Sequence, residues 1–149
     1  MNEGKDGVMN EADRLDSISE ALSIPTVERH IFLCADQTTP KCAPREVTHE
    51  LWAHLKARLK ETGLASAPPG WSGKPGVEPT PVEPGRGSVL RSKVDCLRIC
   101  EQGPICVVYP EGTWYANLDR ESLDRVIDQH LVGGRPVEEL VFAVTGESR

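Results

Sequence analysis

The 149-residue sequence has no long apolar run and little basic charge. No stretch approaches the roughly 20 residues that span a bilayer, and residues 1 to 24 have neither the apolar segment of a signal peptide nor the Arg-rich character of a transit peptide. Its 17 Lys and Arg stand against 23 Asp and Glu, a formal net charge of -6. That charge disfavours a nucleic-acid partner and favours a basic protein partner. We expect a cytoplasmic protein with no membrane segment.

Several familiar cysteine spacings are also missing. The sequence contains no Cys-x-x-Cys, which excludes the thiol-disulfide oxidoreductase motif, and no tight zinc knuckle or plant-type ferredoxin spacing. The cysteines number five, so complete disulfide pairing would leave one thiol over. A reducing cytosol disfavours disulfides in any case. Metal ligation is therefore the favoured role for the cysteines.

Four of the five cysteines form two pairs, Cys34 with Cys42 and Cys96 with Cys100. Soft thiolates select iron-sulfur clusters or zinc over calcium or magnesium. Four thiolates supplied by two loops would satisfy either an iron-sulfur cluster or a structural zinc ion. Cys106 lies within an apolar run, where a free cysteine is typically a small buried side chain. The sequence thus predicts a metal site at the two pairs and leaves Cys106 outside it.

Composition divides the chain into one domain with two tails and an insertion. Residues 1 to 27 form an acidic, flexible tail in which Leu15, Ile18 and Leu22 permit one short amphipathic helix. The domain extends over residues 28 to 143, and residues 144 to 149 form a C-terminal tail. Within the domain, residues 64 to 87 are rich in Pro and Gly and read as a flexible insertion. This insertion suits a spacer or a ligand for a proline-binding module.

The domain pattern is strand, helix, three strands and helix. Strands are predicted over residues 29 to 34, 88 to 94, 105 to 109 and 113 to 115, and helices after residues 44 and 119. The first helix has an apolar residue at every fourth position: Val47, Leu51, Leu55 and Leu59. This order predicts an α/β (α+β) fold, a thioredoxin-like mixed four-stranded sheet with flanking helices. Two strands that end near cysteines would place a metal site in two loops at one end.

The cysteine segments also carry a family resemblance. Cys96-Leu-Arg-Ile-Cys100-Glu-Gln-Gly-Pro precedes a Tyr-Pro-Glu-Gly-Thr-Trp-Tyr hairpin that ends at Tyr115, and His130 opens the run His-Leu-Val-Gly-Gly-Arg-Pro. With Cys34 and Cys42, these motifs resemble the thioredoxin-like [2Fe-2S] ferredoxins, the Shethna-type family, over most of residues 29 to 143. The acidic tail and the long insertion depart from the family pattern.

The resemblance implies a [2Fe-2S] cluster ligated by Cys34, Cys42, Cys96 and Cys100. It further implies a one-electron carrier, not an enzyme, that shuttles electrons between a reductase and an acceptor protein and could pair as a homodimer. The alternatives are a cluster-bearing subunit of a larger redox complex, because the resemblance extends to the thioredoxin-like subunit of respiratory NADH dehydrogenase, and a protective or sensing partner of such a complex. A zinc-stabilised binding module is the remaining alternative.

Residues around the cysteines would tune such a cluster. Its reduction potential depends on hydrogen-bond donors aimed at the sulfurs, and backbone N–H groups of both loops could supply them. Gly103 lacks a side chain, which would let the backbone after Cys100 pass close to the cluster. Lys41 and Arg98 could favour the reduced state through their positive charge.

Overall fold

The computed structural model describes residues 10–65, 71–80 and 87–148. A five-stranded mixed sheet has the strand order β2-β1-β3-β4-β5, and its β1–β2 pair is parallel whereas the other pairs are antiparallel. The strands are β1 (Arg29–Cys34), β2 (Val89–Val94), β3 (Cys106–Tyr109), β4 (Thr113–Tyr115) and β5 (Val141–Val144). The mixed sheet and its parallel first pair confirm the predicted fold class. Within the described residues, no helix has the length and apolar character needed to cross a membrane.

The fifth strand is a correction to the four-stranded sheet predicted from the sequence. β5 pairs with β4 in an antiparallel register, Thr113 with Val144 and Trp114 with Ala143, and the register shifts at a bulge beside Tyr115. The strand is short, and its residues are only partly buried. Phe142, its largest side chain, is 40% exposed and packs edge-on against the Trp114 ring. Such a strand lacks the alternation of buried and exposed residues that would mark it in the sequence.

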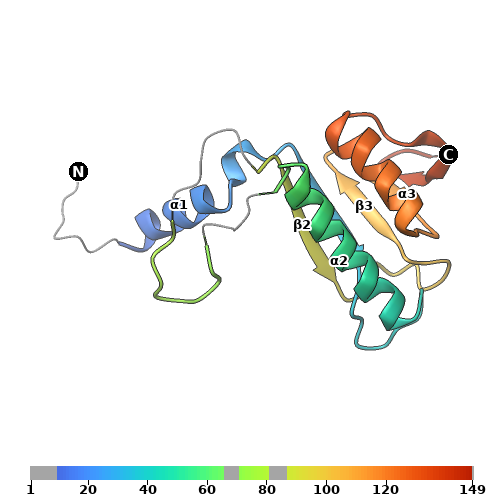
Figure 1. Cartoon of the computed structure of the whole chain (residues 1–149), viewed down its shortest axis with the longest axis horizontal. Coiled ribbons are helices and arrows are strands. Elements are labelled where there is room, and N and C mark those ends of the chain that lie inside the picture. The colour runs from blue at the N-terminus through green and yellow to red at the C-terminus, as the bar shows by residue number, and fades with distance from the viewer. Residues whose placement is uncertain (1–9, 66–70, 81–86, 149) are drawn as a thin grey trace.

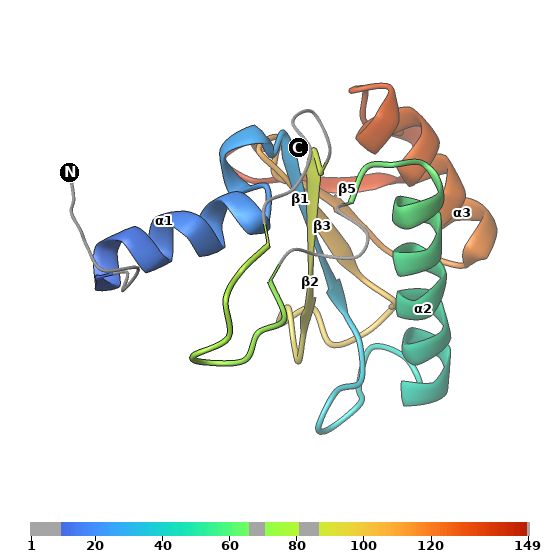
Figure 2. The ribbon, with the colours of Figure 1, turned by 60° about the vertical axis from the view of Figure 1, so that its left-hand side comes forward.

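Helices cover one face of this sheet. α2 (Arg45–Glu61) and α3 (Arg120–Arg125), which continues as a π-helical segment over Val126–Val132, lie side by side on that face, while α1 (Glu11–Ala21) extends away on the opposite side (Figures 1 and 2). Short 3-10 turns occupy Ile24–Thr26 and Glu138–Leu140. The core lies between the sheet and the two covering helices, and its largest buried side chains include the following: Ile31, Leu33, Leu55, Leu59, Leu123 and Ile127.

The buried face of α2 differs from the predicted one at a single position. Leu51, Leu55 and Leu59 are buried as predicted, but Val47 is 46% exposed and Thr48 is fully buried in its place. The hydroxyl of Thr48 lies 3.0 Å from the side-chain oxygen of Gln37, so this turn of the helix faces the polar loop after β1. The apolar face of α2 therefore begins one turn later than the residue periodicity indicates.

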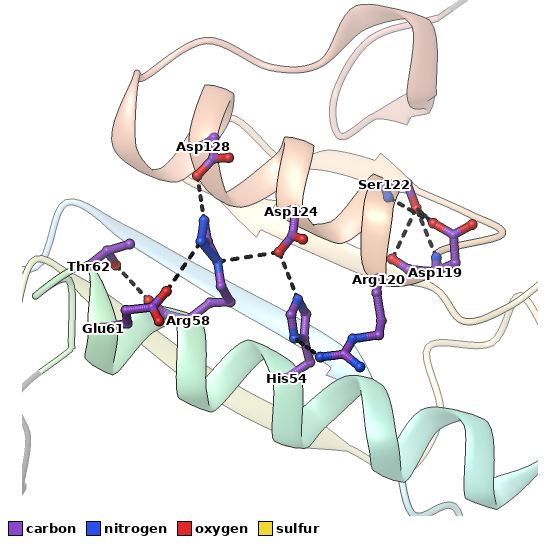
Figure 3. A network of polar contacts seen from close by, with 9 residues as sticks. All are labelled: His54, Arg58, Glu61, Thr62, Asp119, Arg120, Ser122, Asp124 and Asp128. Carbon is purple, nitrogen blue, oxygen red and sulfur yellow. Dashed lines mark hydrogen bonds and ion pairs between the residues drawn. The ribbon is translucent and has the colours of Figure 1, made fainter.

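A polar network on the outer side of the helices connects α2 with α3 (Figure 3). Arg58 donates to Asp128 at 2.6 Å and forms an ion pair with Asp124 at 3.4 Å. Arg120 donates to Nδ1 of His54 at 3.1 Å, so His54 carries its hydrogen on Nε2 and donates it to Asp124 at 2.7 Å. These contacts fix α3 against α2 above the apolar core.

A second network lies inside the core, at the end of the sheet where β1 begins. The Val137 N–H donates to the Tyr115 hydroxyl at 3.0 Å, and that hydroxyl donates to Nδ1 of His130 at 2.8 Å. His130 Nε2 then donates to Glu111 at 3.0 Å, and Arg29 donates to the same carboxylate at 2.9 Å. His130 is fully buried, and burial lowers its pKa although the Glu111 carboxylate opposes this shift. The network therefore holds a neutral imidazole.

The short helix predicted within the N-terminal tail is present as α1. The side chain of Asn10 caps it by accepting from the backbone N–H of Asp13 at 2.8 Å. Arg14 reaches the segment of residues 71 to 80, where its guanidinium lies 5.3 Å from the centroid of the Trp71 ring and donates to the Val77 carbonyl at 2.7 Å. Residues 1–9, 66–70 and 81–86 lie outside the described part of the chain. The predicted flexibility of the 1–27 tail and the 64–87 insertion stays a prediction.

Candidate metal centre

The parallel pairing of β1 and β2 places the two cysteine-bearing loops at one edge of the sheet. Cys34 is the last residue of β1 and pairs with Val94, the last residue of β2, while Cys96 follows two residues later. The backbone N–H of Thr38 donates to the Asp95 carboxylate at 2.6 Å and joins the first loop to the second. Parallel neighbours present their carboxyl ends together, so the topology itself brings the cysteine pairs into proximity.

The four paired cysteines line one cavity of about 160 Å³. The remaining lining residues are Gln37, Thr39, Lys41, Asp95 and Leu97. Cys106 does not line this cavity and is fully buried within β3, as expected of a small core side chain. The structure thus gathers Cys34, Cys42, Cys96 and Cys100, whereas their role as metal ligands stays a prediction.

Burial makes the thiolate form of Cys34 unfavourable unless a cation is bound. This residue is 3% exposed, and burial raises its pKa to about 12. The nearby thiols of Cys42 and Cys96 raise the pKa further, while the backbone of Leu97 opposes the shift. A metal ion that binds here would supply the positive charge that stabilises clustered thiolates. The donor chemistry of the cavity therefore fits a thiolate-bound metal group.

Gly103 permits the second loop to pack directly on the first. A Cβ atom at this position would lie 2.7 Å from the sulfur of Cys42 and 2.9 Å from its carbonyl oxygen. The backbone N–H of Gly103 donates to that same carbonyl at 2.9 Å. The backbone after Cys100 thus packs directly on Cys42, and its expected approach to a cluster stays a prediction.

Besides the Leu97 backbone bond to Cys34, hydrogen-bond donors from both loops point at cysteine sulfurs. The backbone N–H of Arg98 lies 3.2 Å from the sulfur of Cys96, the kind of donor expected from the loop backbone. The side-chain amide nitrogen of Gln37 lies 3.1 Å from the sulfur of Cys42. Sequence reasoning missed Gln37, because a polar residue between two cysteines does not reveal in which direction its side chain turns. Lys41, proposed from its charge, lines the cavity.

The part of the chain that the structure describes contains no ready-made metal-ion site. Within the described residues, no three His, Cys, Asp or Glu side chains form a group that could hold a single metal ion. A [2Fe-2S] cluster divides its four protein ligands between two irons, so each iron takes two thiolates. Ligation of a cluster by these four cysteines stays a prediction.

Comparisons with curated proteins identify related ferredoxins. No protein-family model matches the chain. The chain is 46% identical over 48 residues to a 2Fe-2S ferredoxin of Aquifex aeolicus (strain VF5), a match that covers 32% of this chain and 43% of the relative. It is 40% identical over 52 residues to a 2Fe-2S ferredoxin of Clostridium pasteurianum, covering 35% of this chain and 51% of that relative. The chain thus spans about half, or less, of the length of these relatives.

Solved structures show the same fold over a larger part of the chain. A cysteine-to-serine variant of the thioredoxin-like [2Fe-2S] ferredoxin from Aquifex aeolicus superposes with a TM-score of 0.55 at 23% identity, over 78% of this chain and 99% of that one. Another structure of a thioredoxin-like [2Fe-2S] ferredoxin from this organism gives a TM-score of 0.53 at 23% identity, over 81% and 96% of the two chains. The predicted resemblance is confirmed: this chain has the fold of the thioredoxin-like [2Fe-2S] ferredoxins and is related in sequence to 2Fe-2S ferredoxins.

Proposed function

We propose that this protein is a one-electron carrier that holds a [2Fe-2S] cluster through Cys34, Cys42, Cys96 and Cys100. The observation that carries the proposal is the cavity at the sheet edge, which these four thiols line together. The relatives in sequence and in fold are named as 2Fe-2S ferredoxins, which supports the same cofactor here. When bound, such a cluster takes up and releases a single electron.

The exposure of the cysteines suits exchange of electrons with another protein. Cys34 is buried at the base of the site, whereas Cys96 and Cys100 are exposed. A cofactor held between them would lie near the surface, where a reductase or an acceptor protein can approach. The cavity, at about 160 Å³, is smaller than the roughly 300 Å³ of the smallest usual small-molecule sites. The names of the relatives, 2Fe-2S ferredoxins, support a carrier without substrate chemistry of its own.

Replacement of individual cysteines tests the ligand set. Cys42→Ser and Cys96→Ser should each lower the iron and acid-labile sulfide bound per chain, because each removes a soft sulfur ligand. Cys106→Ala is the matched control: its sulfur lies in the core, outside the cavity, and the variant should retain the wild-type content. Circular dichroism would confirm that the three variants are folded. Equal loss of iron in all three would refute this choice of ligands.

The proposal includes redox-protein partners, a cytoplasmic location and a homodimer. Each has its own measurement. Crosslinking in cell extract before and after reduction would capture a partner that recognises one redox state, cell fractionation would locate the protein, and sedimentation equilibrium would determine its mass in solution. Stable co-purification with a flavoprotein would favour the alternative of a cluster-bearing subunit within a larger complex.

A further inference from the structure

The sulfur of Cys42 receives a hydrogen bond from a buried side chain. Nε2 of Gln37 lies 3.1 Å from this sulfur, and Gln37 is only 2% exposed although its side chain is polar. A buried donor has lost its hydration and needs a partner within the protein. An N–H directed at a thiolate is a charge-assisted bond, which is stronger than a neutral one and is weakly screened inside the protein.

Thr48 determines which end of the Gln37 amide faces the sulfur. The hydroxyl of Thr48, which is fully buried on α2, donates to Oε1 of Gln37 at 3.0 Å. The Arg45 carbonyl, 3.1 Å from the same hydroxyl, is the alternative acceptor. With its oxygen engaged, the amide turns its NH₂ group toward Cys42. The reversed amide would direct an oxygen at a negatively charged sulfur and would repel it. The attractive orientation is therefore the one that the contacts on both sides of the amide support.

Arg45 holds the backbone from which this side chain projects. Its guanidinium donates to the Gln37 carbonyl through Nε at 2.9 Å and through Nη2, and Nη2 donates to the Thr38 carbonyl at 3.0 Å. Arg45 and Thr48 both belong to the first turn of α2. The start of this helix therefore fixes Gln37 at two points, its carbonyl and its amide oxygen.

We propose that Gln37, held by Thr48 and Arg45, donates a hydrogen bond to the Cys42 ligand and raises the reduction potential of the site. The proposal rests on the [2Fe-2S] function given above. Reduction by one electron increases the negative charge shared by the cysteine sulfurs. A donor aimed at one of them stabilises the reduced state more than the oxidised state.

The midpoint potential of the full-length cluster-bearing protein tests this role. Gln37→Leu keeps a side chain of similar size and removes the donor, so the equilibrium constant for reduction should fall about tenfold, a potential lower by about 59 mV for a one-electron couple. Gln129→Leu is the matched control, since it makes the same substitution at an exposed position of the Val126–Val132 segment, outside the cavity. Its potential should equal that of the wild type.

Thr48→Val supplies an independent test through a residue that does not touch sulfur. Freed from the hydroxyl, the Gln37 amide should donate less well, and the potential should fall by less than in Gln37→Leu. The double variant should match Gln37→Leu alone, because Gln37 is the sulfur donor that the Thr48 hydroxyl contacts. Full additivity of the two shifts would overturn the role assigned to Thr48.

The outcomes separate this inference from the proposed function. Iron and sulfide analysis of each variant accompanies the potential measurement. An intact cluster with equal potentials in wild type and Gln37→Leu would overturn the role of Gln37. The proposed electron-carrier function would be unaffected by that result. If Gln37→Leu fails to retain the cluster, Thr48→Val decides: an unchanged potential there overturns the proposal, and a lowered one supports it. A wild-type protein without iron and sulfide would overturn both proposals.

Discussion

Replacement of Gly103 by alanine would place a methyl group inside the contact between the two cysteine loops. The added Cβ would lie 2.6 Å from the Cβ of Cys42, 2.7 Å from its sulfur and 2.9 Å from its carbonyl oxygen. All three distances are under 3.0 Å, closer than a Cβ atom approaches any of these atoms without displacing it. The backbone of Gly103 is outside the left-handed region, so the change introduces a clash without backbone strain.

The Cys42 atoms cannot move away from the added methyl group at low energetic cost. Two of the three opposing atoms are near or within the backbone of Cys42, and the Gly103 N–H bond to the Cys42 carbonyl holds the loops at this separation. Overpacking of this kind costs about 1 to 3 kcal/mol. In a chain of this length the cost corresponds to a melting temperature lower by about 2 to 12 °C. Movement of the Cys42 sulfur should also lower the amount of iron retained.

Thermal unfolding and iron analysis of purified Gly103→Ala would measure both effects. Gly73→Ala is the control, because Gly73 has a positive φ of 81° and nothing within 4 Å of the added Cβ. It should cost some stability through backbone strain but should keep the wild-type iron content. Wild-type stability together with full iron in Gly103→Ala would refute the close packing of the two loops.

The two polar networks give further predictions. Stability should fall as the pH drops below about 6.5, because the lowered pKa of buried His130 lets the unfolded chain bind a proton that the folded chain resists. His130→Gln should reduce this loss in urea unfolding between pH 7.5 and pH 5.5, and an identical pH slope in both proteins would contradict the argument. Arg58→Met removes the ion pairs with Asp124 and Asp128 and should cost about 1 kcal/mol at low salt but less at 1 M salt. A loss that salt does not change would refute an electrostatic role.

Most elements of the fold follow from local sequence signals. The apolar run that ends at Cys34, the four-residue spacing of Leu51, Leu55 and Leu59, and the cap at Asp119 each correspond to an element of the structure. β5 could not be predicted in this way, because its partly buried residues lack alternation and it depends on pairing with β4. β5 is a strand because it pairs with β4, and local sequence patterns do not encode such tertiary pairing.

At the candidate site, too, the sequence predicts some features and not others. Two cysteine pairs that follow adjacent parallel strands can be placed together from spacing and topology alone. The donor from Gln37 could not be predicted, since its direction depends on Thr48, which belongs to another element. The four-residue spacing assigned the buried position to Val47, yet the packing of α2 against the loop selected Thr48. The residues that tune a site therefore emerge only from the contacts between elements.

An electron paramagnetic resonance spectrum of anaerobically purified protein, recorded before and after chemical reduction, tests the central claim most directly. An oxidised [2Fe-2S] centre is silent, and its one-electron reduced form gives a signal. The proposed electron carrier predicts silence before reduction and a signal afterwards, with two irons and two sulfides per chain. Silence in both states, with zinc found by metal analysis, would contradict the account and would make this protein a zinc-stabilised binding module.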